Sequence, residues 1–249
     1  MSLRSPRWAL AALALLLVFL VLTLPAPHFL GWFGGGRVAA QGIEGTAWRG
    51  RVERVAIDGF PLGPVVWQMR PLALLAGRLE YQLFVQSGSG GGELRFGRSL
   101  FGSTRVSDAQ LTLPAAEAGR RLGLTMATLD GDFHVDIADL SLVDGWADAL
   151  EGQALWQKAQ VLQPSPLPLG TLQMQLGLRE GRIVGALSDD PNGPLELSGE
   201  FVLGAERQYQ LDALIKPRAG ADPQLREALG LLGNPDAQGR YRLQYSGTL

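Results

Sequence analysis

The sequence predicts a mainly β protein, in which an N-terminal single transmembrane helix precedes a duplicated, curled antiparallel β-sheet domain with one short helix per repeat. Three observations predict this fold. An uncharged apolar run lies near the start of the chain. Most of the remainder alternates apolar and polar residues with a period of two, which is typical of strands with one wet face. The 33 Gly and 15 Pro residues favour many short strands over long helices.

The apolar run predicts the transmembrane helix. Arg4 and Arg7 precede the uncharged stretch from Trp8 to Leu24, which at a rise of about 1.5 Å per residue reaches roughly 25 Å, enough to cross a bilayer core. The leading positive charges keep the N-terminus in the cytoplasm and send the rest across the membrane. A cleaved signal peptide is the alternative, but its apolar region is usually shorter, and the one tempting cleavage site, Val38–Ala40, lies far downstream.

Matched segments predict that the remaining chain is a duplication. Ile43–Ala47 resembles Leu150–Ala154, and Pro61–Gly63 matches Pro168–Gly170. Further matches follow in the same order: Gly77–Leu79 with Gly181–Ile183, Pro114 with Pro217, and Gly131–Val135 with Gly239–Leu243. We therefore expect a cytoplasmic tip, anchor and juxtamembrane segment over 1–34, a first β-rich repeat over 35–145, and a second over 146–249.

The alternation leaves room for only two helices. Ser87–Gly92 and Asp190–Gly193 are typical of hairpin loops. We expect short helices over Pro114–Leu122 and Asp222–Leu232, the second capped by Asp222, started by Pro223 and ended by Gly233. Two such helices cannot cover the apolar faces of so many strands. Because apolar surface left wet costs about 25 cal/mol per Å², the sheets must curl or pack on each other.

No residue pattern predicts catalysis, a metal or a cofactor. The chain has no Cys and only two His, which excludes thiol chemistry and leaves little material for a Ser-His-Asp triad. Asp130, Asp132, His134 and Asp136 share one side of a strand, but the duplicate carries Gln and Arg at the matching positions, which favours a solvated face over a metal site. A net charge of −2 argues against nucleic acid as a partner.

The first repeat carries motifs that resemble the type II secretion system protein N (general secretion pathway protein N) family. The C-terminal stretch Pro217–Leu243 is also similar to that family's C-terminal region. The motif residues in the first repeat are Gly45, Trp48, Gly50, Pro61, Gly63, Trp67, Pro71 and Gly77. The Gly-x-x-Trp-x-Gly opening also resembles larger periplasmic proteins of the AsmA type, whose curled sheets are associated with lipid handling.

The resemblance implies a single-pass inner-membrane protein with a periplasmic domain and no catalytic residues. Its partners would be other type II secretion components in the inner membrane and periplasm, contacted from the membrane tether set by Arg4, Arg7, Trp8 and Leu24. A second hypothesis is a periplasmic binding or transfer module for lipid or another apolar ligand, held against the one-sided apolar strands. An enzyme is the third reading and has no support in the sequence.

Overall fold

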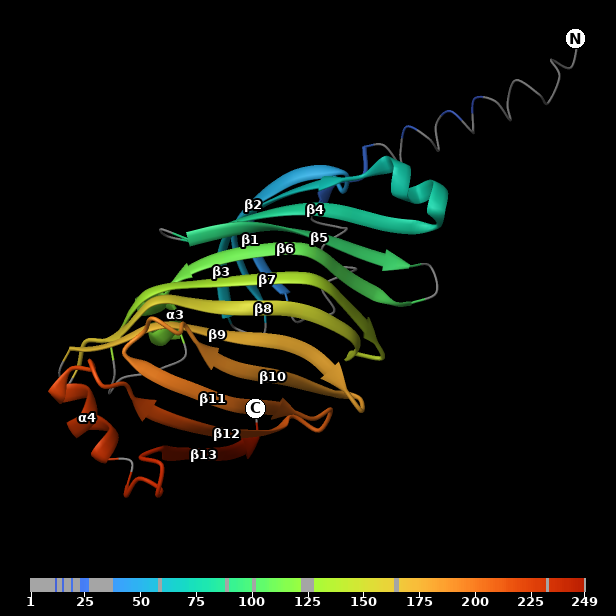
Figure 1. Cartoon of the computed structure of the whole chain (residues 1–249). Coiled ribbons are helices and arrows are strands. Elements are labelled where there is room, and N and C mark those ends of the chain that lie inside the picture. The colour runs from blue at the N-terminus through green and yellow to red at the C-terminus, as the bar shows by residue number, and fades with distance from the viewer. Residues whose placement is uncertain are drawn as a thin grey trace, which may run out of the picture.

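The described residues form one open antiparallel sheet of 13 strands, with short helices between some of them. A computed structural model describes residues 12, 15, 19, 23–26, 38–57, 60–87, 90–99, 102–121, 128–163, 166–231 and 233–248. Each strand pairs with the strands before and after it in the chain, so the sheet is an uninterrupted meander (Figure 1). The mainly β fold class is therefore confirmed, and the sheet continues without a break across residues 145 and 146.

The elements follow one another with short connections. The strands are β1 (Val38–Gly45), β2 (Arg49–Ile57), β3 (Phe60–Met69), β4 (Arg78–Ser87), β5 (Gly90–Ser99), β6 (Thr104–Pro114), β7 (Leu129–Val143), β8 (Trp146–Val161), β9 (Leu167–Arg179), β10 (Arg182–Asp189), β11 (Leu195–Leu203), β12 (Gln208–Pro217) and β13 (Tyr241–Thr248). The described helices are the 3₁₀ helix η1 (Pro71–Ala76), α3 (Ala115–Arg121) and α4 (Pro223–Gly230).

One face of the sheet is apolar from edge to edge. The strand register connects a single row of paired residues across all the strands, and every member is aliphatic or glycine. The row is Ile43, Val52, Val65, Val85, Gly92, Leu111, Val135, Ala154, Met174, Leu187, Gly199, Ala213 and Leu243. We call the side of the sheet that carries this row the inner face.

The neighbouring row, one residue along each strand, lies on the opposite or outer face and is mostly polar. Its apolar members are Val66, Phe84 and Ala186. The other members are Glu44, Arg51, Glu93, Gln110, Asp136, Gln153, Gln175, Glu200, Asp212 and Gln244. The contrast between the two rows is the pattern expected of a sheet that turns one side away from water.

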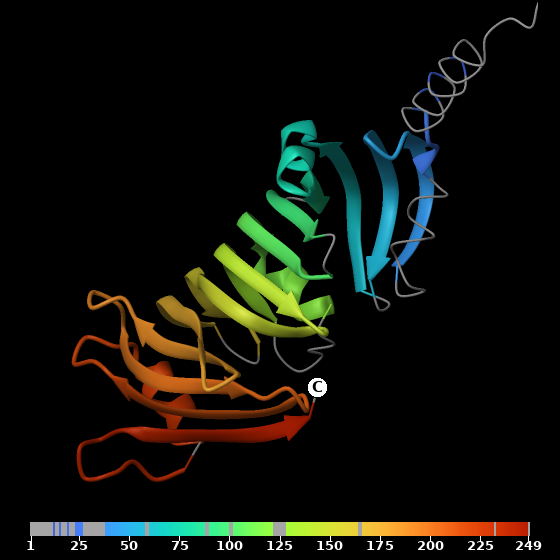
Figure 2. The same cartoon turned by 90° about the vertical axis from the view of Figure 1, so that its right-hand side faces the viewer.

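The inner face lies on the concave side of a curled sheet. Figure 2 shows the strands stepping around a wide arc from β1 to β13. A Cβ atom added to inner-face Gly199 would lie 2.6 Å from the Asp212 carbonyl oxygen, and one on Gly152 would lie 2.7 Å from that of Asp136. On the outer face, a Cβ on Gly97 or Gly177 in the body of a strand would meet nothing closer than 3.8 Å, whereas one on Gly91, beside the β4–β5 hairpin, would lie 2.8 Å from the Val85 carbonyl oxygen. Curling therefore compresses the inner face, where glycine relieves the crowding.

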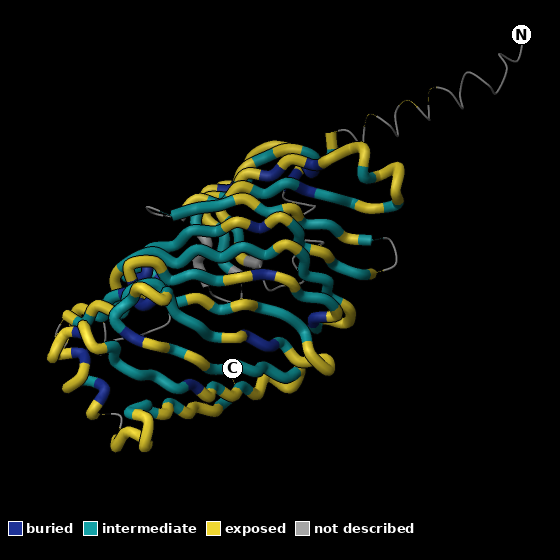
Figure 3. Tube along the Cα trace, in the orientation of Figure 1, coloured by how far each residue is buried: buried dark blue, intermediate teal, exposed yellow. Residues whose placement is uncertain are grey.

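No second layer covers the inner face among the described residues, apart from helices at one end of the strands. Most inner-face side chains are half-buried, and Figure 3 shows buried residues only as isolated points along the strands. Helix α4 packs Leu225 and Leu229 against Leu195, with Leu197 and Tyr241 beside them. Helix α3 contacts β6 and β7. The sheet therefore reduces the water exposure of its inner-face side chains by curling, and not by packing against a second sheet.

Local sequence signals place the start of helix α4 correctly and its end less well. The Asp222 side chain caps the helix by accepting a hydrogen bond from the Gln224 N–H at 2.8 Å, and Pro223 occupies the first turn, as predicted. The helix ends at Gly230, before the expected Gly233. Leu231, next in the chain, is 86% exposed, so no apolar contact draws the helix further.

The expected transmembrane helix lies largely outside the described residues. Ala12, Leu15 and Phe19 are helical, and Thr23 donates its backbone N–H to the Phe19 carbonyl at 3.0 Å, an α-helical bond. Within the described part of the chain, no helix combines the length and apolarity needed to cross a bilayer.

A matched pair of glycine substitutions tests the compression of the inner face. We expect Gly199→Ala to lower the free energy of unfolding by about 1–3 kcal/mol, because the new methyl group overlaps the backbone of β12. Gly177→Ala on the outer face should change it by less than about 0.5 kcal/mol. Urea unfolding followed by circular dichroism measures both, and equal destabilisation by the two variants would contradict the assignment of the concave side.

Candidate functional site

The segment that follows the predicted membrane helix is docked directly onto the first hairpin of the sheet. The Leu24 carbonyl accepts a hydrogen bond from the Ala47 N–H at 2.8 Å, and Pro25 forms a β-bridge with Thr46. Ala26 is completely buried in a cluster with Val52, Trp67, Met69 and Tyr81. We call residues 24–26, 45–50 and 67–77 the N-terminal corner. This corner fixes the end of the predicted anchor against the folded domain.

Two glycines let the β1–β2 hairpin close tightly at this corner. Gly45 has a φ of +99°, a conformation that side chains rarely adopt, and a Cβ there would lie 2.5 Å from the Arg49 carbonyl oxygen. A Cβ on Gly50 would overlap the Trp67 ring. The Trp67 indole N–H donates to the Thr46 carbonyl at 3.1 Å. Trp67 therefore packs on a surface that only glycine provides, and holds the hairpin that receives Leu24.

The short helix η1 leaves the sheet at the same corner. The Met69 N–H donates to the Trp48 carbonyl at 2.7 Å, so β3 ends beside the residue that follows Ala47. Pro71 then starts η1 within its first turn, and Gly77 ends it with a φ of 67°. None of the residues of η1 is buried. In Figures 1 and 2, η1 and residues 23–26 lie at the same end of the strands.

The structure gathers most, but not all, of the sequence-predicted residues. The N-terminal corner contains Leu24, Gly45, Trp48, Gly50, Trp67 and Pro71, with Gly77 at its boundary. Pro61 and Gly63 lie at the other end of β3, where they pair with β2 around a bulge. Arg4, Arg7 and Trp8 lie outside the described residues. The sequence analysis did not single out the exposed Leu72, Leu74 and Leu75 as site residues. The signal that could have found them is the presence of three leucines directly after an Arg-Pro pair.

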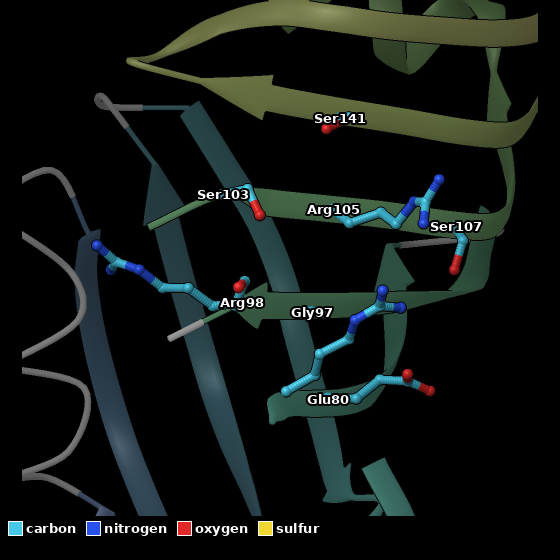
Figure 4. Close-up of a pocket in the computed structure, with 9 residues that line it drawn as sticks. Glu80, Gly97, Arg98, Ser103, Arg105, Ser107 and Ser141 are labelled. Atoms are coloured by element: carbon cyan, nitrogen blue, oxygen red, sulfur yellow. The ribbon is translucent and has the colours of Figure 1, made fainter. Parts of the chain in front are cut away.

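A second feature is a shallow polar pocket of about 220 Å³ on the outer face, over β4–β7 (Figure 4). Glu80, Gly97, Arg105 and Ser141 form a row of register partners across it. Arg105 donates to both carboxylate oxygens of Asp139, at 2.6 and 2.8 Å. This hydrogen bonding lowers the pKa of Asp139 and raises that of Arg105. The most central cation of the pocket is therefore already neutralised.

The described lining of this pocket contains no Ser-His pair. The pocket is lined by serines, arginines and Glu80 with no histidine, so its serines have no positioned general base of the Ser-His kind. His134 lies on β7 but away from the pocket lining, where its Nδ1 is 3.1 Å from the Thr112 hydroxyl in a cross-strand pair. Among the described residues, no three His, Asp or Glu side chains gather as a metal site would require.

Comparison with known proteins decides the family. A sequence profile described as type II secretion system (T2SS), protein N, matches residues 36–244. The chain belongs to the type II secretion system protein N family. The resemblance carried by the motif residues is thereby confirmed. The profile spans the sheet from before β1 to within β13, so the match covers nearly the whole meander.

Two relatives cover most of the chain. The type II secretion system protein N of Vibrio cholerae serotype O1 is 29% identical over 214 residues, which are 84% of each chain. That of Aeromonas hydrophila is 28% identical over 246 residues, 96% of this chain and 95% of the relative. No solved structure matches the chain. Protein N is thus a component of type II secretion, a system that acts in the cell envelope, and its family is not a known enzyme family.

Alkaline titration tests the packing of the N-terminal corner. Burial raises the pKa of Tyr81 from 10.0 to about 12, so the unfolded chain loses this proton first. Stability contributed by neutral Tyr81 is complete below pH 10 and is lost as the pH rises toward 12. We expect the unfolding free energy to fall more steeply over this interval in the wild type than in Tyr81→Phe. Tyr245→Phe, at a 59% exposed position, is the control, and parallel slopes for all three proteins would contradict the burial.

Proposed function

We propose that this protein N is an accessory component of the secretion machinery, held in the inner membrane by residues 8–24 and acting from the periplasm through protein–protein contacts. The N-terminus lies in the cytoplasm in this arrangement, because Arg4 and Arg7 precede the apolar run. The observation that carries the proposal is the docking of Leu24 and Ala26 at the N-terminal corner, which joins the end of the anchor rigidly to the sheet.

A tether of this kind supports function through effective concentration. A domain confined to a membrane surface meets other membrane-bound components far more often than the same domain in free solution. Because Ala26 packs in the same cluster as Trp67 and Tyr81, the tether also limits how the sheet is oriented toward those components. The described surface offers strand edges and polar side chains for contacts, and no arrangement that performs a reaction.

Replacing the anchor while keeping the domain tests the proposal. In a strain that lacks protein N, we compare the full chain with a chain whose residues 1–24 are exchanged for a cleavable signal peptide. At equal periplasmic levels, we expect the full chain to restore export of secreted proteins and the released domain to restore it at least about tenfold less. Strong overproduction of the released domain should recover export, because mass action replaces the tether.

Secretion assays and crosslinking distinguish the outcomes. Full rescue by the released domain at native level would show that the tether is dispensable. Unchanged export in the deletion strain, together with no crosslink from the full chain to other secretion components, would remove the accessory role altogether.

The inner face favours a second candidate function, the binding of an acyl chain or another apolar ligand. Its leucine, valine and aromatic side chains are mostly half-buried and lack a covering layer among the described residues. Apolar ligands bind to concave, mostly apolar surfaces. The polar outer face provides the comparison within a single strand, since Leu176 and Gln175 of β9 lie on opposite faces.

Matched charge substitutions test the apolar ligand. If the inner face holds lipid, native mass spectrometry of the full chain in detergent should show bound lipid in the wild type and in Gln175→Glu. We expect at least several-fold less of that lipid in Leu176→Glu, because an unpaired carboxylate on the apolar face is costly. Equal lipid in all three proteins, or none in any, would contradict this second function.

We also propose that the sheet is a duplication of a six-stranded unit, β2–β7 followed by β8–β13, with β1 as an added edge strand. Pro61–Gly63 opposite β2 and Pro168–Gly170 opposite β8 form the same bulge, with Gly63 and Gly170 at φ values of 83° and 86°. A single helix precedes the last strand of each unit. The sequence match between Ile43–Ala47 and Leu150–Ala154 does not fit this pairing of strands, because Ile43 lies in β1 and Leu150 in β8. An experimental structure whose units superpose only with a shift of one strand would contradict the duplication.

A further inference from the structure

The helix η1 exposes three leucines on a rigid support. Leu72, Leu74 and Leu75 are 78%, 46% and 88% exposed. The backbone is fixed at both ends, since the Ala73 N–H donates to the Arg70 carbonyl at 3.2 Å and the Gly77 N–H donates to that of Leu74 at 3.0 Å. The three leucines are therefore exposed to water because a formed helical turn holds them outward. Their exposure does not come from a loosely placed chain.

The duplicated architecture shows that the sheet does not need this helix. At the equivalent connection of the second unit, residues 177–179 remain paired with β10, and the strands are joined by a turn that ends at Gly181. The first unit has a longer segment, Pro71–Ala76, which leaves the ladder. Only the unit attached to the N-terminal segment carries η1, and it places the exposed leucines at the N-terminal corner.

We propose that η1 rests in the boundary between headgroups and acyl chains of the membrane that residues 8–24 cross, with its leucines inserted; this rests on the proposed tether. The position of η1 beside the end of the anchor supports this proposal. The Trp48 carbonyl accepts a hydrogen bond from Met69, which ends β3, and the adjacent Ala47 N–H donates to the Leu24 carbonyl. Three leucines alone bind a bilayer weakly. The tether makes their insertion an intramolecular step, so a small apolar contact is enough.

The contact is apolar and does not depend on a basic surface. With Arg4 and Arg7 set aside, the chain has 20 basic and 24 acidic side chains, which gives no general attraction to anionic lipid. Arg70, at the start of η1, is paired with Glu80 at 2.6 Å. Insertion of η1 gives the domain a second point of attachment beside the anchor, and two points of attachment restrict its rotation over the membrane surface.

Depth measurement by electron paramagnetic resonance tests the proposal on the full chain. The protein has no cysteine, so single nitroxide labels can be placed at Leu16→Cys in the anchor, Leu75→Cys in η1 and Leu231→Cys beyond α4. Leu231 is the matched control, because it is 86% exposed against 88% for Leu75. The protein is placed in nanodiscs of phosphatidylethanolamine with phosphatidylglycerol as the minor lipid, and the accessibility of each label to oxygen and to a nickel chelate is compared.

We expect the oxygen-to-nickel accessibility ratio at position 75 to exceed that at 231 several-fold, and position 16 to read deeper still. Leu72→Ser with Leu74→Ser should bring position 75 down to the value at 231, and these exposed changes leave the fold intact. If the label at position 16 lies in lipid and the label at position 75 lies in water, the insertion of η1 is overturned and the proposed tether stands. Aqueous readings at both positions overturn both, and a lipid reading at 75 alone keeps the contact of η1 and removes the tether.

Discussion

The fold depends on a strand register that keeps thirteen strands in phase. A slip of one residue between any two strands would turn every later apolar side chain onto the wet face. Two of the bulged strand pairs show how a bulge can respect this constraint. Between β2 and β3, an extra residue on β2 is followed by an extra residue on β3, and the same compensation occurs between β8 and β9. The two irregularities cancel within each pair, so the sheet bends locally while its inner face remains apolar throughout.

This constraint gives the described residues an extended surface built mainly from neighbouring strands. Each strand is stabilised almost entirely by its two neighbours, as in a repeat protein, and the described residues bring together few segments that are distant in sequence. Catalytic sites usually need side chains from several distant segments. The N-terminal corner is one exception, because Ala26 and Trp67 come together there with Tyr81. It is also the place where the secretion component joins its proposed anchor.

The sequence predicts what depends on near neighbours. Alternation along 172–179 and 241–245 places strands and faces correctly, because side-chain direction follows directly from a period of two. The capping of α4 by Asp222 is equally local. The curl follows from the shortage of covering helices, but the single layer and η1 do not follow from any local pattern. Nothing near Gly199 shows that the β12 backbone approaches it, and the Arg-Pro-Leu segment reads as strand or loop until its partner strand is known. The docking of Ala26 likewise depends on residues far along the chain.

The meander also sets how far the protein reaches in the proposed arrangement. Neighbouring strands lie about 4.8 Å apart, so the twelve steps from β1 to β13 carry the chain roughly 58 Å along the arc away from the anchored edge. The two ends of the strands differ as well. The end with η1 exposes leucines beside the anchor, whereas at α4 Arg218 donates to Asp189 at 2.7 Å and to three backbone carbonyls. In the proposed arrangement, the η1 end faces the membrane and the α4 end points away from it, which gives the tethered sheet an orientation toward its partners.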